Sequence, residues 1–166
     1  MFIRDAFTRL TLDLAEVDAT GVASGSTCLP DLRLKVRLRS APQASRLLAF
    51  SVTTDGIWLS GSDCAAFLHT LADLDRTRRG SAEISGQTPE AFRLRVAAAD
   101  SAGHIIVEGH VGGSFLGPPL NHVQTTVGYG IEVDPTVLPR LVADISTLLT
   151  LPNPSSARPP TASGVA

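Results

Sequence analysis

The sequence predicts an α+β protein in which a mainly antiparallel β-sheet of about seven to eight strands carries one central helix and one C-terminal helix. Three observations lead to this fold class. Most of the chain alternates apolar and polar residues with period two, only the segments 61–80 and 134–150 have helical spacing, and strands do not alternate regularly with helices as in a parallel sheet. Within the 166 residues we expect a single domain over 1–150 and a disordered, proline-rich tail over 151–166.

Period-two alternation predicts the strands, because successive side chains of a strand point to opposite faces. The clearest example is the segment 31–40, in which aliphatic residues alternate with Arg33, Lys35, Arg37 and Arg39. Asp55-Gly56 is typical of a two-residue hairpin turn, and the glycines and prolines of Gly112–Pro119 predict a loop. The expected strands cover residues 7–17, 31–40, 46–53, 57–59, 81–85, 92–96, 104–111 and 123–133.

Apolar residues three and four positions apart predict the two helices. For the first helix, the pair Ser62-Asp63 supplies the expected N-terminal caps and Gly80 marks the expected end. The second helical segment begins at Asp134-Pro135, where a proline loses no hydrogen bond. Because Pro139 lacks a backbone donor deeper in the segment, the regular helix could begin only there.

The composition bears on the partners and the compartment. A net charge of -2 and a pI near 6.0 give no general attraction to nucleic acid or to acidic membranes, so we expect neither as a partner. The N-terminal segment is interrupted by charges and does not resemble a signal peptide, and no segment has the roughly 20 apolar residues of a membrane helix. We therefore expect a cytoplasmic protein. The sequence does not indicate its oligomeric state.

Cys28 and Cys64 are the only cysteines. A disulfide between them is an open alternative, but one bridge in a chain of this length does not indicate a secreted scaffold. Cys64 falls in the first turn of the first predicted helix, a position that can activate a thiol, and also on the apolar stripe of that helix. We expect it to be a small packed residue rather than a nucleophile.

Two rows of polar side chains are the candidate functional surfaces. His104, Glu108 and His110 lie on one face of a predicted strand, but residues two apart on a strand are about 6.6 Å apart, too far to share one metal ion without help from a residue such as His122. We expect a solvated face there, with no metal and no cofactor. The other row is the basic one, Arg33, Lys35, Arg37 and Arg39. It either meets an acidic partner or forms cross-strand ion pairs with Glu83, Glu108 and Glu132.

Several short motifs follow one another from the middle of the chain onward. They are Asp63 with Phe67 and Leu71, then Gly80-Ser81-Ala82, Glu90 before the strand Phe92–Val96, the turn Asp100–Ile105, and Asp134-Pro135-Thr136. In kind and order, over residues 7–147, they resemble the WapI-like immunity proteins, which neutralise toxins of bacterial polymorphic toxin systems. Pro135 stands where that family has Gln, and its early Trp-Leu has no counterpart here.

The resemblance implies a non-enzymatic immunity protein that binds and blocks a cognate toxin domain. The residues offer two surfaces for that partner: Arg33, Lys35, Arg37 and Arg39, which we favour because a face of one charge sign attracts an opposite one, and His104, Glu108 and His110. The alternative is an accessory or ligand-binding adaptor domain of unknown role. An enzyme comes third, because the sequence has no dense acid–base cluster.

Overall fold

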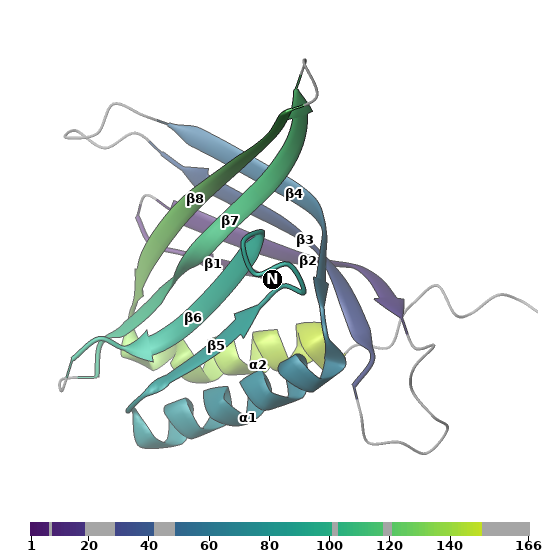
Figure 1. Ribbon diagram of the computed structural model, residues 1–166. Coiled ribbons are helices and arrows are strands. Elements are labelled where there is room, and N and C mark those ends of the chain that lie inside the picture. Colours follow the sequence, from purple (N-terminus) through teal and green to yellow (C-terminus); the bar gives the residue numbers. More distant parts are fainter. Residues whose placement is uncertain (7, 19–28, 42–48, 101–102, 118–120, 151–166) are drawn as a thin grey trace, which may run out of the picture.

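The protein folds into two antiparallel β-sheets and two α-helices, as the computed structural model of residues 1–6, 8–18, 29–41, 49–100, 103–117 and 121–150 shows (Figure 1). The predicted α+β class is confirmed. The sequence did not indicate that the eight strands of the described residues divide equally between two sheets. The elements are β1 (Phe2–Arg4), β2 (Thr8–Asp18), β3 (Asp31–Ser40), β4 (Phe50–Leu59), α1 (Gly61–Thr77), β5 (Ser81–Ser85), β6 (Phe92–Ala98), β7 (Ile105–Gly117), β8 (Asn121–Val133), the 3₁₀ turn η1 (Pro135–Val137) and α2 (Leu138–Thr150).

Each half of the chain has the same element order, four strands followed by a helix. In the first sheet β1, β2, β3 and β4 are neighbours in sequence order, and in the second sheet β5, β6, β7 and β8 are. Every pair is antiparallel. The short β1, which the alternation did not predict, is the first of the four strands of the first half and lies at the edge of its sheet.

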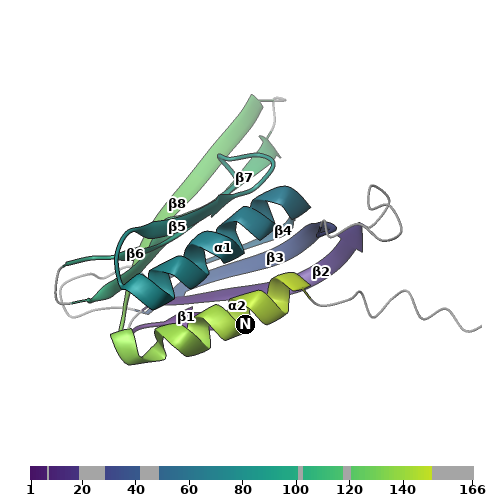
Figure 2. The ribbon, with the colours of Figure 1, turned by 90° about the horizontal axis from the view of Figure 1, so that it is seen from below.

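One hydrophobic core joins the two halves. The inward residues of both sheets and the apolar stripes of both helices belong to a single cluster of buried side chains. The sheets meet where β8 contacts β1 and β2 and where β7 contacts β4, and α1 packs on β5, β6 and α2. Figure 2 shows the two helices lying side by side across the strands. Each sheet therefore keeps one face on the core and turns the other outward.

The predicted hairpin at Asp55-Gly56 is wrong. β4 runs without interruption from Phe50 to Leu59, and Gly56 is an extra residue between the register pairs Leu34–Ile57 and Lys35–Asp55. Its φ of 91° is accessible to glycine and strained for other residues, so the Asp-Gly signal marks a β-bulge within the strand. The loop predicted at Gly112–Pro119 is also wrong over residues 112–117, which belong to β7.

Helix α1 begins and ends at residues other than those predicted. Ser60 is the N-cap, and its hydroxyl accepts a hydrogen bond from the Asp63 amide at 3.1 Å. At the other end the C-cap is Arg78, not Gly80: Arg78 adopts the left-handed conformation with φ 55°, and Gly80 follows with a φ of 85°. The backbone amide of Arg78 donates to the carbonyl of Leu74 at 2.8 Å, and its guanidinium donates to the carbonyl of Pro135 at 2.8 Å. The strained backbone of Arg78 is thus supported by a contact with a residue far away in the sequence, which no local sequence pattern reveals.

The second helical segment follows the expectation set by its prolines. Asp134 caps η1 by accepting a hydrogen bond from the Thr136 amide at 2.8 Å, and the regular helix α2 begins at Leu138. Pro139 therefore falls in the first turn, where a missing donor costs no hydrogen bond. The predicted disordered tail, residues 151–166, and Cys28 lie outside the described residues.

Candidate functional site

The basic row Arg33, Lys35, Arg37 and Arg39 projects from the outer face of the first sheet, as the alternation predicts. Leu32, Leu34, Val36 and Leu38 between them are buried, with at most 1% of their surface exposed. The row is not uniform. Arg33 lies 3.0 Å from Glu16 of β2, and Lys35 lies 3.1 Å from Asp55 of β4. The predicted partners Glu83 and Glu108 lie in the second sheet, so the expected cross-strand pairing occurs in this row with different carboxylates.

Both of these ion pairs depend on β-bulges. The register shifts between Leu14 and Glu16 in β2, which places Glu16 opposite Arg33. The extra residue Gly56 in β4 likewise places Asp55 opposite Lys35. A shift of one residue moves side chains to the other face of a strand, so these bulges bring the two carboxylates onto the outer face. Half of the basic row is thereby neutralised.

The other half of the basic row has no such neutralisation. Among the described residues, no carboxylate lies within ion-pair distance of Arg37 or Arg39. Arg39 is instead in register with Arg9 of β2, and Arg9 is in register with Arg4 of β1. We refer to Arg4, Arg9, Arg37 and Arg39 as the arginine cluster.

Phe2 lies within the arginine cluster. Its side chain faces outward. Phe2 is 51% exposed and is the most exposed large apolar residue among the described residues. The guanidinium carbon of Arg9 is 4.4 Å from the centre of the ring, and that of Arg4 is 5.8 Å away. Both distances suit cation–π contacts, which hold the ring and the two cations together on the surface.

A groove runs along the edge strand beside this cluster. Its volume is about 620 Å³, and residues of β1, β8, η1 and α2 line it. Phe2 and Arg4 line it from the β1 side, while Val137, which is 42% exposed, and Leu141 line it from the helical side. Arg140 and Asp144 add one charge of each sign. Figure 2 shows β1 and α2 close together at this edge of the molecule. We call it the edge groove.

The residues His104, Glu108 and His110 do not form a joint site. The Nδ1 atom of His104 is 2.5 Å from a carboxylate oxygen of Asp100, Glu108 is bonded to Arg95, and the Nε2 atom of His110 is 2.9 Å from the carbonyl oxygen of Pro89. No group of three or more side chains suited to binding a metal occurs in the part of the chain that the structure describes. Each of the three residues is therefore engaged by a separate partner.

The electrostatics of His104 follow from its neighbours. The hydrogen bond to Asp100, and then the negative charge of Asp100, raise the pKa of His104 above its usual range, with smaller contributions in the same direction from Glu132 and Asp134. The hydrogen bonds from Thr136 lower the pKa of Asp134. These shifts describe a local charge pair at the surface of the second sheet rather than a catalytic acid and base.

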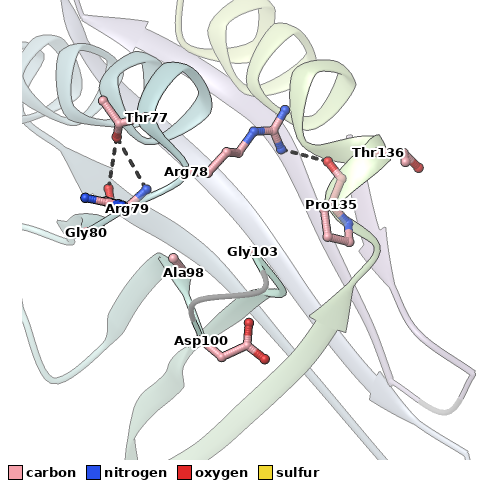
Figure 3. Close-up of a pocket in the computed structure, with 9 residues that line it drawn as sticks. All are labelled: Thr77, Arg78, Arg79, Gly80, Ala98, Asp100, Gly103, Pro135 and Thr136. Carbon is pink, nitrogen blue, oxygen red and sulfur yellow. Dashed lines mark hydrogen bonds between the residues drawn. The ribbon is translucent and has the colours of Figure 1, made fainter.

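A second cleft, of about 730 Å³, lies between the end of α1, the end of β6 with Asp100 and Gly103 after it, and the 3₁₀ turn (Figure 3). Its polar groups have structural roles. The guanidinium of Arg78 points across to the Pro135 carbonyl, and the Thr77 hydroxyl contacts the backbone of Arg79 at 3.3 Å. The Arg78 guanidinium and the Thr77 hydroxyl of this cleft are therefore engaged within the protein.

Cys64 is a packed residue, as predicted. It is free, fully buried in the core cluster, and burial raises the pKa of its thiol to about 12. A thiol with so high a pKa supplies almost no thiolate near neutral pH and is a poor nucleophile. Within the described residues, neither helix has the length and apolar character needed to cross a membrane.

Comparisons of the chain with models of protein families, with curated proteins and with solved structures found no match. The inference about function therefore depends on the surface itself. Sequence reasoning identified Arg37 and Arg39 but missed Phe2, Arg4 and Arg9. The only signal for the first two was the alternation around Ile3, and three residues are too few to distinguish a strand from chance.

Proposed function

We propose that this protein is a non-enzymatic immunity protein that binds a cognate bacterial toxin domain and blocks it. The resemblance of its spaced motifs to the WapI-like immunity family supports this role. The observation that carries it is the unneutralised half of the basic row: Arg37 and Arg39 project outward beside Arg9 with no described carboxylate in reach. A protein that acts by blocking a partner needs such a recognition surface and no catalytic group of its own.

The charge arrangement favours Arg37 and Arg39 over the remainder of the predicted surface. Arg33 and Lys35 already have carboxylate partners, so a toxin would have to compete with Glu16 and Asp55 for them. Cations without partners attract an acidic protein surface during diffusion and form new ion pairs when it docks. We assign His104, Glu108 and His110 no central part in binding, since their polar atoms are engaged within the protein.

This function needs no cofactor, and it places the protein in the cytoplasm, where it would protect the cell that makes it. The toxin domain is expected to carry a complementary acidic surface. The natural candidate is a toxin domain encoded beside this protein's gene, because immunity proteins and their toxins are used as pairs.

The test is co-expression of this protein with that toxin domain in a bacterial host, with growth as the readout and co-purification as the measure of complex formation. Wild-type protein should restore growth and co-purify with the toxin domain. The double substitution Arg37→Glu plus Arg39→Glu should weaken both, because it turns attraction into repulsion. The matched control is Arg76→Glu plus Arg79→Glu, which makes the same charge change at the exposed end of α1.

Melting temperatures of the purified variants separate loss of binding from loss of folding. If the wild-type protein neither restores growth nor co-purifies with the toxin domain, the proposed function is wrong. Capture of a non-toxic partner by the same surface would support the alternative role of an adaptor domain.

A further inference from the structure

We propose that the arginine cluster and the edge groove together form one binding site for an acidic segment of a partner protein that carries an apolar residue beside its carboxylates. This inference rests on the proposed function, because it takes the toxin domain as the partner. It extends the site from β3 to the edge strand β1 and to α2, which sequence reasoning did not include.

The cations of the arginine cluster lie next to one another on the first sheet. Arg4, Arg9 and Arg39 are register neighbours across β1, β2 and β3, which makes a row of three like charges at the outer surface. Arg37 lies two residues along β3, on the same face. Like charges directly opposite one another on a sheet destabilise it. A bound carboxylate between them would relieve that repulsion, so the free protein is prepared for an anionic group.

Phe2 connects the arginine cluster with the edge groove. The ring contacts the guanidinium groups of Arg4 and Arg9 and also lines the edge groove. The cationic surface and the edge groove are therefore continuous at Phe2 and Arg4. Exposed aromatic and arginine side chains are the residue types that dominate protein interfaces, because they offer a large contact area and several hydrogen-bond donors.

The edge groove is lined mostly by apolar side chains. Val137 of η1 and Leu141 of α2 line the groove together with Phe2 and Ile3, and Leu148, about two helical turns after Leu141, lines it as well. An apolar side chain bound there would remove Phe2 and Val137, the two exposed large hydrophobic residues of the described chain, from water. The groove is therefore suited to an aliphatic or aromatic side chain, flanked by carboxylates that reach Arg4 and Arg9.

The same surface is less suited to nucleic acid. A strand of nucleic acid needs a continuous positive path, but the first sheet carries the carboxylates of Asp13, Glu16 and Asp55 on the outer face next to the cluster. Phe2 is one exposed ring rather than a series of stacking platforms. A short acidic protein segment fits the limited extent of the cluster.

The test measures binding of a fluorescently labelled peptide, composed of Asp and Glu around one central Leu, to the full-length protein by fluorescence anisotropy at low salt. A second peptide has Ser in place of Leu, and a single-stranded oligonucleotide is the third probe. The variants are Arg9→Gln plus Arg39→Gln for the cluster, Val137→Ser for the groove, and Arg76→Gln plus Arg79→Gln as the charge-matched control.

We expect the cluster variant to bind the leucine peptide about tenfold more weakly than wild type, and the control to stay within about twofold of wild type. The preference for Leu over Ser should shrink in Val137→Ser. Failure of the wild-type protein to bind the peptide, or equal binding by the cluster variant, would overturn the inference. Tighter binding of the oligonucleotide than of the peptide would overturn it in favour of nucleic acid.

The same variants are then compared in the co-purification with the toxin domain, so that the two proposals fail separately. A cluster variant that captures the toxin domain as well as wild type does would contradict the binding site and leave the immunity function standing. A toxin domain that no form of the protein captures, combined with peptide binding that depends on the cluster, would contradict the function and leave the site standing.

Discussion

On the outer face of the second sheet, both arginines of β6 have a carboxylate partner: Arg93 lies 2.6 Å from Glu83, and Arg95 is bonded to Glu108. On the outer face of the first sheet, Arg37 and Arg39 have none among the described residues, and Arg39 lies in register with Arg9. The two halves share an element order, so the architecture does not require this difference. Unpaired arginines on an outer face therefore distinguish the first sheet among the described residues, and the proposed binding site lies there.

The two sheets also differ in how their strands pack and pair. In the second sheet the backbones of β6 and β7 approach closely at Gly109, and the hydroxyl of Tyr129 donates a hydrogen bond to the Arg93 carbonyl at 3.0 Å. The buried phenol is thereby satisfied, and burial raises its pKa. The first sheet instead contains two bulges, which rearrange its outward charges. A close approach of paired strands at Gly109 is thus a feature of the second sheet, and two bulges that set the outward charges are a feature of the first.

The largest expected effect tests the tight fit of the second half. A Cβ atom at Gly109 would lie 1.9 Å from the Arg93 carbonyl oxygen and 2.9 Å from the Tyr129 hydroxyl. We expect Gly109→Ala to lower the free energy of unfolding by about 3 kcal/mol or more, because β6 and β7 must separate and the buried hydroxyl loses its partner. Denaturant unfolding measures this.

The matched control for Gly109 is Gly128 on the paired strand β8. A Cβ atom there would meet only the Gly109 carbonyl oxygen, at 3.8 Å. Gly128→Ala should therefore change the free energy of unfolding by less than about 0.5 kcal/mol. Equal destabilisation by the two substitutions would show that the close approach at Gly109 is not what stabilises this half.

A second prediction compares the two outer faces directly, by replacing one arginine on each with glutamine. Arg95→Gln breaks a half-exposed ion pair and should lower the free energy of unfolding by up to about 1 kcal/mol. Arg39→Gln removes one of three like charges in register and should raise it by about 0.3 kcal/mol. The two substitutions should therefore change the free energy of unfolding with opposite signs.

Salt provides the control for that pair of variants. Added salt screens both the attraction on one face and the repulsion on the other, so the difference in unfolding free energy between the two variants should shrink at about 1 M salt. A difference that persists unchanged in salt would mean that packing, not charge, separates the two faces.

The smallest expected effect is a pH dependence at His104, which directly precedes β7 of the second sheet; the strands β1–β4 of the first sheet contain no histidine. The raised pKa of His104 means that the folded protein holds this proton more tightly than the unfolded chain does. The stabilisation is fully present below the usual histidine pKa of about 6.5 and is lost as the pH rises through the raised value. The melting temperature of wild type relative to His104→Gln should therefore fall across that interval.

His110→Gln is the comparison for this measurement, because the ring of His110 meets the Pro89 carbonyl and not a carboxylate. A pH-dependent difference of the same size in both variants would show that the His104–Asp100 pair is not its source.

The sequence by itself determined the α+β class, the two helices and most of the strands, including which face of the segment 31–40 is buried. It missed β1 and divided β4 at Asp55-Gly56. The reason is that burial acts residue by residue: alternate aliphatic side chains in 31–40 must leave water together, and the residues between them must then face outward. The same local spacing predicted that Cys64 is buried and that the regular second helix begins near Pro139. These features depend on local spacing, which the chain itself displays.

The tertiary structure alone decided which charges are neutralised. Lys35 and Arg37 both alternate with aliphatic residues, yet Lys35 faces Asp55 and Arg37 faces Thr53. The bulge at Gly56 shifts the register between Leu34 and Lys35, and this shift brings Asp55 opposite Lys35. The end of α1 was decided in the same way, since the left-handed Arg78 is held by a carbonyl 57 residues away in the chain. Charge pairing and helix termination here depend on distant neighbours, and only the folded arrangement of the strands supplies those neighbours.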